Sequence, residues 1–480
     1  MNGAAKAISL HGLKRRALSL GAVKAFDHAM HFLLPIVLVR SLDAQTFGEY
    51  RLLWLAVGTL MVMANLNMGG GLYYFVPRSD SKKKRLYIHQ TLLYFVFAGA
   101  VCAWLVSPWN PLLPEAARQL EPYGALIPAF VGLWFVASLL DYLPTVEERI
   151  RLQAYATVSV SLLRTAMVAL GALATGSLEA ILWLLLALVV IKLAMLLVYI
   201  EMRHGLGRPW FSRKLFANQF RHCAPFGLSG GLYALRGQAD QWIAASLFAL
   251  SSFAAFSIAA LVGQVVHIFR HSVMEAFLPS MSRLHASGDV NGMMEMNRRG
   301  NVIVGMLLYP LLALAFAFAE EIITIVYTAA YLEAAPVMRV FIAGMAAMVI
   351  EMGSITLLLR EGAFALRTNV LALAFSLAVS WTGALVLGLP GAALGSVLAV
   401  YLDRAIMLRR VSQRTGIPFA RVQDWRALGL ALATAAVSAA LAWVLVHRFL
   451  EEAAPLARVA AGAAILAAAY GLLNLRRGRK

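Results

Sequence analysis

The sequence predicts an all-α polytopic membrane protein with about fourteen transmembrane helices. Two observations on its 480 residues lead to this fold class: 61% of them are hydrophobic, and only 14% are charged, whereas soluble proteins average about a quarter charged. A third is that apolar stretches of membrane length recur from one end of the chain to the other. Because no long polar stretch interrupts them, we expect one integral membrane protein and not a soluble enzyme with an anchor.

The predicted spans follow from length, because a helix needs about 20 apolar residues to cross a bilayer. Residues Met1 to Leu20 form a basic leader that runs directly into the first span, so no cleavable signal is expected. The predicted spans are 18–39, 52–76, 91–109, 122–143, 154–175, 180–200, 223–248, 252–278, 301–319, 334–358, 364–388, 391–409, 427–447 and 456–475.

The basic residues predict the orientation of these spans. Of the 42 Lys and Arg residues, 30 fall in the two ends and in the loops on the same side as the ends, and 5 fall on the opposite side. Loops rich in Lys and Arg stay in the cytoplasm. We therefore expect both termini to be cytoplasmic. The same rule explains most of the net charge of +18, so nucleic acid is not expected as a partner.

The loops and cysteines argue against several other classes of protein. The loops on the non-cytoplasmic side are too short for a folded catalytic domain, and the candidates for catalytic acids there are Asp43 and Glu49 in the first loop. No G-x-x-x-x-G-K loop for a nucleotide occurs. Cys102 and Cys223 are the only cysteines, and both lie in or beside spans, so neither a disulfide framework nor a metal cluster is expected. We predict no catalytic residue and no enzyme activity.

An internal repeat divides the chain into two halves. Phe47 to Tyr50 aligns with Phe253 to Phe256 at an offset of 206, and Pro77 aligns with Pro279. Both copies start from the cytoplasmic side, so the halves are predicted to be parallel repeats, a design common in transporters. The predicted domains are a six-helix bundle (1–200), a basic cytoplasmic linker (201–222), a second six-helix bundle (223–410) and an additional two-helix segment with a basic tail (411–480).

Cations within the predicted spans indicate the kind of substrate. Lys24, Arg164, Lys192, Arg236 and Arg270 would together cost on the order of 12–18 kcal/mol if they all faced lipid. We therefore expect most of them to face inwards. Because these cations and the histidines outnumber the nearby acids, the surplus predicts an anionic substrate. The residues predicted to bind it are Arg164, Arg236, Arg270 and Lys24.

Acids and histidines in the spans are candidates for ion coupling, because such groups form proton relays in transporters. Asp27 and His31 are one turn apart and are expected to pair. The predicted coupling or tuning residues are Asp27, His31, Asp240, His267, His271, Glu275 and Glu351. Coupling to H⁺ or Na⁺ is expected, with no other cofactor and no bound metal.

The sequence leaves the neutralisation of several charges open. Arg236 and Asp240 could pair along one helix, and Lys192 could extend to the membrane surface. Arg164, with no acid within one turn, needs an acid from another helix, a water-filled cavity or an anionic ligand. Asp403 and Arg404 lie near enough to the cytoplasmic end of their span for a solvated role.

Several motifs, in order, resemble the polysaccharide-biosynthesis transporters, or oligosaccharide flippases. The segment LVRSLDAQTFGEY contains the Arg-x-Leu element followed by Phe-Gly-x-Tyr, and Asp240, LPSMSRL, IVYTAAYLEAAPVMRVF and GAALGSVLAVYL follow in the second half. This resemblance implies the multidrug/oligosaccharidyl-lipid/polysaccharide exporter superfamily, with two six-helix bundles in a V around a central cavity. The family commonly has twelve helices, so 427–475 would be an added pair.

The resemblance also implies a function. Members of the family move undecaprenyl-pyrophosphate-linked glycans across the bacterial inner membrane, which fits a cationic cavity. We therefore expect a flippase for a lipopolysaccharide, O-antigen or exopolysaccharide repeat unit, with membrane lipids and a polysaccharide polymerase and co-polymerase as partners. The alternatives are a cation-coupled multidrug extruder of the same superfamily, whose substrates favour an acidic cavity, and a membrane glycan polymerase or glycosyltransferase.

Overall fold

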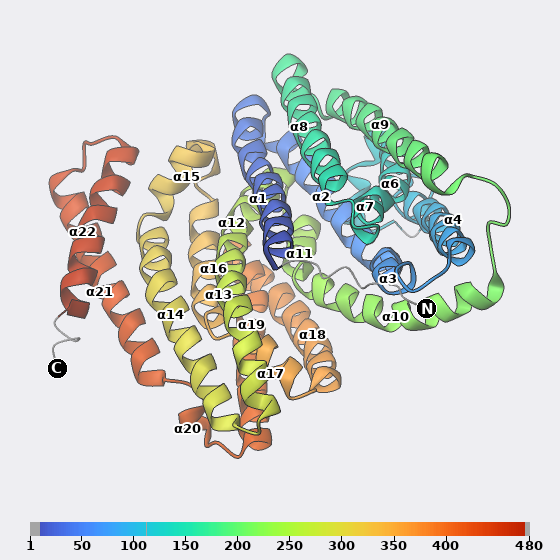
Figure 1. Ribbon diagram of the computed structural model, residues 1–480. Coiled ribbons are helices and arrows are strands. Elements are labelled where there is room, and N and C mark those ends of the chain that lie inside the picture. The colour runs from blue at the N-terminus through green and yellow to red at the C-terminus, as the bar shows by residue number, and fades with distance from the viewer. Residues whose placement is uncertain (1–9, 112, 476–480) are drawn as a thin grey trace. The chain divides into compact units, whose positions relative to one another are not determined.

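The computed structural model describes residues 10–111 and 113–475, and all regular structure in this part of the chain is helical (Figure 1). The chain forms two compact units, Met1–Gly231 and Leu232–Lys480, which are described separately below. The side chains of Lys24, His267, His271 and Glu275 lie outside the described residues.

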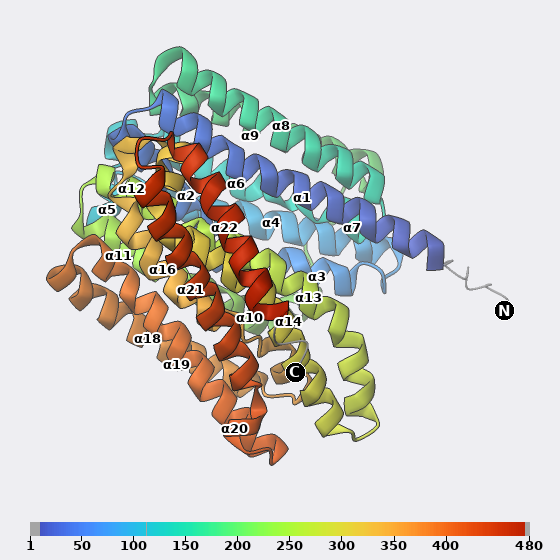
Figure 2. The same cartoon turned by 90° about the vertical axis from the view of Figure 1, so that its left-hand side faces the viewer.

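Unit 1 is a bundle of long helices in which α1 packs along α8, α4 packs on α6, and α9 packs on both α6 and α8. In Figure 2, α1, α8 and α9 run side by side. The elements are α1 (Leu10–Ser41), α2 (Ala44–Asn65), α3 (Met68–Phe75), α4 (Ser81–Leu105), α5 (Glu115–Arg118), η1 (Glu121–Tyr123), α6 (Leu126–Ala137), η2 (Ser138–Asp141), α7 (Leu143–Val146), α8 (Ile150–Thr175), α9 (Leu178–His204) and α10 (Arg213–Arg236), the last of which ends in unit 2.

Local signals explain where the early helices begin and end. Asp43 accepts a hydrogen bond from the backbone N–H of Thr46 and so caps α2. Asp80 caps α4 in the same way. Between α2 and α3 the backbone of Leu66 and Asn67 takes positive φ values of 43° and 57°, a conformation that a continuous helix does not contain. The predicted span 52–76 is therefore two helices.

Unit 2 contains the remaining elements. They are α11 (Ala239–Leu247), α12 (Leu250–Ala260), α13 (Val262–Ala286), α14 (Val290–Ala317), α15 (Ala319–Tyr327), η3 (Ala329–Tyr331), α16 (Ala334–Met348), α17 (Gly353–Leu358), α18 (Gly362–Leu387), α19 (Leu389–Thr415), α20 (Phe419–Val422), α21 (Trp425–Phe449) and α22 (Pro455–Leu475).

Small residues allow the closest packing in unit 2, between α18 and α19. A Cβ atom added at Gly391 would collide with the backbone carbonyl of Gly383, so the two backbones approach as they do at small-residue interfaces in membranes. At the C-terminal end, Phe318 is fully buried against Gly462 and Ala442. This contact joins α21 and α22 to α14 and α15, so the added helix pair is part of unit 2.

The fold confirms a multi-pass, all-helical membrane protein. Within the described residues, ten helices are long and apolar enough to cross a membrane; the predicted number of fourteen spans stays a prediction. Four predicted spans each become a pair of α-helices: α2 with α3, α10 with α11, α12 with α13, and α16 with α17. A fifth, 122–143, contains α6, the 3₁₀ turn η2 and the start of α7. Cys102 and Cys223 are both unpaired and fully buried.

Candidate functional site

Unit 1 holds a charged cluster where α1 packs on α8. Arg164 of α8 is only 7% exposed. Its Nη2 lies 3.6 Å from Oδ1 of Asp27 and 3.1 Å from Nδ1 of His31, both on α1. Arg164 thus finds an acid on another helix, one of the three alternatives that the sequence left open. The expected pairing of Asp27 with His31 is confirmed at 3.7 Å.

His31 has two competing partners for the same nitrogen. Its Nδ1 lies within hydrogen-bond distance of Arg164 and also 2.9 Å from the backbone carbonyl of Asp27. A bare Nδ1 can accept from the guanidinium, whereas a protonated Nδ1 can only donate, which suits the carbonyl. The protonation state of His31 therefore decides whether it is bonded to Arg164.

Unit 2 holds a second cluster, in which two arginines share one carboxylate. Nη1 of Arg236, at the end of α10, lies 3.4 Å from Asp403 and donates to Asn369 at 2.7 Å. Nη1 of Arg404 lies 3.1 Å from the other oxygen of Asp403. The Asp403 side chain is only 9% exposed, so the expectation of a solvated Asp403–Arg404 pair is wrong. With two cations on one acid, this cluster carries a net positive charge.

Arg270 and Glu351 border this second cluster. Nη1 of Arg270, on α13, donates to the carbonyl of Met348 at 3.4 Å. Glu351 accepts hydrogen bonds from the backbone N–H groups of Gly353 and Ser354. Glu351 thus satisfies the N-terminus of α17, where a carboxylate is favourable. Both side chains are close enough to Arg404 for their charges to interact with it.

A helix break separates Arg236 from Asp240, so the alternative in which these two residues pair is wrong. Arg236 ends α10, and α11 begins only at Ala239, so the pair does not have the i, i+4 geometry that the spacing suggested. Asp240, 3% exposed, instead accepts a hydrogen bond from Oγ of Ser396 at 2.7 Å and one from the N–H of Gln241. Its partners among the described residues are uncharged.

Two further buried hydroxyls lie on α18, one of the helices that pack on the helix of Asp240. Its helix, α11, packs on both α18 and α19. Ser376 and Ser380 of α18 are buried, and their hydroxyls have no hydrogen-bond partner in the part of the chain described. Ser380 packs against Gly395, the residue before Ser396. A buried carboxylate among hydroxyls is a site where a proton or a small cation would be stabilised.

Lys192 does not extend to the membrane surface, so that prediction is wrong. Its side chain is 4% exposed, and Nζ lies 2.8 Å from Oδ2 of Asp141 and over the ring of Trp134. Asp141 was missed because it lies at the end of a predicted span and far from Lys192 in the sequence. Lys24, His267, His271 and Glu275 stay predictions, because their side chains are outside the described residues.

Comparisons with known proteins identify the family and the fold. Residues 37–336 match the family model described as "Polysaccharide biosynthesis protein". The fold is similar to the lipid II flippase MurJ in an inward closed conformation, with TM-score 0.65 and 12% identity over 95% of this chain and 99% of that chain.

Transporters of the MOP superfamily also share the fold. An inward-facing multidrug resistance MATE family transporter has TM-score 0.62 and 12% identity over 81% of this chain and 95% of that chain. A MOP superfamily transporter from Pyrococcus furiosus has TM-score 0.52 and 10% identity, over 84% of this chain and 96% of that chain. A comparison with curated proteins found no match. Since the family model covers more than half of its length, the chain belongs to the polysaccharide biosynthesis protein family, with the fold of a MOP superfamily transporter.

Proposed function

We propose that this protein is a flippase that moves an undecaprenyl-pyrophosphate-linked oligosaccharide across the bacterial inner membrane by alternating access, with both termini in the cytoplasm. The family and the fold support transport of a glycan intermediate. The observation that carries the proposal is the pair of arginines, Arg236 and Arg404, that share the single carboxylate of Asp403.

The chemistry of this arginine pair fits a pyrophosphate. A guanidinium presents several donors in a planar fork that matches phosphate oxygens. Nε of Arg404 is buried without a partner among the described residues. Arg270 and Glu351 lie nearby with opposite charges, so they leave the positive excess of the pair unchanged. An uncompensated charge at membrane depth costs roughly 2.5–3.5 kcal/mol. A bound pyrophosphate would relieve that cost.

Ion coupling is proposed at two places. In unit 1, a proton on Nδ1 of His31 would exclude its bond to Arg164 and favour the carbonyl of Asp27. In unit 2, Asp240 among hydroxyls would bind H⁺ or Na⁺. Either step changes the local charge in its unit, which is what a gradient-driven transporter requires.

A multidrug extruder is the second candidate, because a MATE family transporter shares the fold. Its cationic substrates would meet the arginine excess around Asp403, which repels them. A glycan polymerase or glycosyltransferase has less support, since the similar structures are transporters. A polysaccharide polymerase and co-polymerase are proposed as partners of the flippase.

The test is a flipping assay with lipid-linked glycan in vesicles that contain the purified protein. Arg236→Ala and Arg404→Ala should each slow flipping roughly 10- to 100-fold, since a hydrogen bond to a charged group contributes about 1.5–3 kcal/mol. Arg164→Ala should slow it as well. The matched control is Arg448→Ala, an exposed arginine on α21, which should flip at the wild-type rate.

Two outcomes would overturn the proposal. Wild-type flipping in both Arg236→Ala and Arg404→Ala would remove the assignment of the cationic site. Efflux of a cationic dye without any glycan flipping would favour the multidrug extruder instead.

A further inference from the structure

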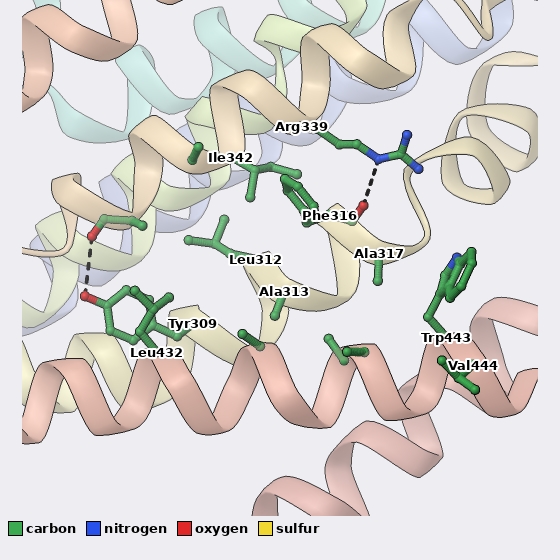
Figure 3. Close-up of a pocket in the computed structure, with 15 residues that line it drawn as sticks. Tyr309, Leu312, Ala313, Phe316, Ala317, Arg339, Ile342, Leu432, Trp443 and Val444 are labelled. Carbon is green, nitrogen blue, oxygen red and sulfur yellow. Dashed lines mark hydrogen bonds between the residues drawn. The ribbon is translucent and has the colours of Figure 1, made fainter.

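An apolar groove lies in unit 2 between α14, α16 and α21 (Figure 3). Its volume is ≈ 530 Å³, within the range of small-molecule sites. The larger side chains on its walls are Tyr309, Leu312 and Phe316 from α14, Ile342 from α16, and Leu432 and Trp443 from α21. None of the residues of the arginine cluster around Asp403 lines it.

Alanines create this groove. Ala313 on α14, Ala343 on α16 and Ala440 on α21 all line it, and their short side chains leave space that larger residues would fill. At one end, Tyr309 donates a hydrogen bond to the carbonyl of Ala346 at 3.4 Å, and Leu432 lies beside it (Figure 3). Leu432 is 42% exposed, so this end of the groove also reaches the surface of the helix bundle.

Along its length the groove opens to the outside of the bundle. Phe316 is 45% exposed and Trp443 is 43% exposed. Because α14 and α21 are membrane-spanning helices, the medium that reaches these side chains is lipid. An apolar groove open to lipid accepts a hydrocarbon chain and not a polar solute.

At the end of the groove near Trp443, the lining includes one cation, which pairs with an acid. Arg339 is the charged residue of the groove lining, and it lies at the same end as Trp443 and Val444 (Figure 3). Its Nε donates to the carbonyl of Phe316 at 3.2 Å, and its Nη2 donates to Oε1 of Glu320 at 3.1 Å. Both charged side chains are partly exposed, and this leaves Nη1 of Arg339 and Oε2 of Glu320 for other partners.

We propose that this groove binds one acyl chain of a zwitterionic phospholipid that carries a primary ammonium, with the phosphate on Arg339 and the ammonium on Glu320. An arginine donates to phosphate oxygens, and a carboxylate accepts from an ammonium. Trp443 lies beside them, as tryptophans do where a chain meets its headgroup. The lipid would bridge α21 to α14 and α16. This role is separate from the flippase substrate.

The charges disfavour two other occupants. An anionic phospholipid, or a polyprenyl pyrophosphate, would bring negative charge next to Glu320 and to the buried Glu321. Arg339 is paired with Glu320, and Glu321 is paired with Arg458 at 3.4 Å and lies 3.1 Å from His447. The charges described at this end therefore already balance, and a further negative charge would find no counter-charge. A phospholipid with its own ammonium matches both charges.

The experiment measures which lipid stays with the purified full-length protein after detergent washing, by native mass spectrometry with added phosphatidylethanolamine, phosphatidylcholine, phosphatidylglycerol or polyprenyl phosphate. Wild type should retain phosphatidylethanolamine in preference to the other three. Ala440→Phe and the smaller change Ala440→Leu fill the groove and should lower retention about tenfold. Arg339→Gln should abolish the preference for phosphatidylethanolamine.

The matched control is Val437→Phe, which adds the same ring on an exposed face of α21 outside the groove; retention there should equal wild type. Equal retention in Ala440→Phe and Val437→Phe would overturn the proposal. So would a preference for phosphatidylglycerol, or displacement by polyprenyl phosphate, which would make the groove part of the substrate path. Glycan flipping is not measured here, so the two proposals fail separately.

Discussion

The two units place an acid at the same position but give it different partners. In unit 1, Glu147 follows α7 and contacts the end of α9, with Nε2 of His204 at 2.7 Å and a hydrogen bond from Tyr199. In unit 2, Glu361 follows α17 and contacts the end of α19, where Arg410 donates to it at 3.0 Å and Arg414 also binds. If the two units are repeats, as the sequence predicts, the connection is the same in both and its chemistry differs.

The charged clusters inside the two bundles differ in their balance of positive and negative charge. In unit 1, one arginine meets one acid and one histidine, so the charges balance while His31 is neutral. In unit 2, two arginines meet one acid, and the positive charge is in excess. We expect the balanced cluster to respond to protons and the unbalanced one to bind an anion.

Removing the shared acid of unit 2 should have the largest effect. Asp403→Asn leaves Arg236 and Arg404 without a counter-charge, and breaking a buried pair in this way costs about 3–5 kcal/mol. The unfolding midpoint in detergent should fall accordingly. The control is Asp424→Asn, an exposed cap of α21 at which asparagine caps as well as aspartate; equal midpoints for the two variants would contradict the assignment.

Double variants that remove one acid and one arginine should have the next largest effect, and they should affect the stability of the two clusters differently. In unit 1, Asp27→Asn combined with Arg164→Gln removes one acid and one base, so the double variant should lose less stability than the sum of the single variants, by about 0.5–3 kcal/mol. In unit 2, Asp403→Asn with Arg236→Gln still leaves Arg404 unpaired and should recover less. A double-mutant cycle of unfolding free energies measures both effects. Equal recovery of stability in the two units would contradict the excess of positive charge in unit 2.

The acids Glu147 and Glu361 should give smaller, pH-dependent effects on stability. Burial opposes the charged form of Glu361, but hydrogen bonds from Arg410 and Arg414 hold the pKa of this carboxyl below its ordinary value of 4.5. Burial likewise opposes the charge on Glu147, and contacts with His204 and Tyr199 lower its pKa. A lowered pKa stabilises the fold above the ordinary value, and this contribution disappears as the pH falls through the folded-state pKa.

Glu361→Gln should therefore flatten the loss of stability below about pH 4.5. Glu147→Gln should flatten it as well, because that side chain no longer titrates. Unfolding midpoints at pH 7 and pH 4 provide the measurement. If the unfolding midpoint of Glu361→Gln falls between pH 7 and pH 4 by as much as that of wild type, Glu361 does not contribute to the acid sensitivity of the fold.

Helix caps offer the smallest test of the repeat. Asp43 caps α2, whereas Ala249, which lies 206 residues later, precedes α12 without a side-chain cap. Asp43→Ala should destabilise the protein by about 1 kcal/mol, and Ala249→Asn should stabilise it by about 0.5–1 kcal/mol. Thermal unfolding detects both shifts, and opposite signs are the expected signature. A destabilised Ala249→Asn would show that the two helix starts are not equivalent.

Much of the fold could be predicted from the sequence, because apolar length alone locates membrane helices. The interruptions could not be predicted in the same way. The break between Arg236 and Ala239, and the positive φ values at Leu66 and Asn67, occur inside stretches that are long enough and on average apolar enough for a single span, although polar residues and glycines lie at both breaks. Hydropathy reports the solvent around a segment and not the path of its backbone.

The charged clusters show a similar limit. Spacing along one helix correctly paired Asp27 with His31. It failed for Arg236 and Asp240, since a helix break removes the geometry that the rule assumes. The partners Asp141 and Asp403 come from other helices, and a single sequence does not say which helix faces which.

Because both native cysteines are buried, this chain is well suited to labelling at cysteines introduced on its surface. Cys102 and Cys223 are fully enclosed, and burial in apolar surroundings leaves a thiol unreactive towards reagents dissolved in water. A cysteine introduced into any loop would then be the site that a membrane-impermeant maleimide labels, with the native cysteines left in place. Labelling intact cells at one loop after another would map which loops face outwards and so decide the orientation of every helix.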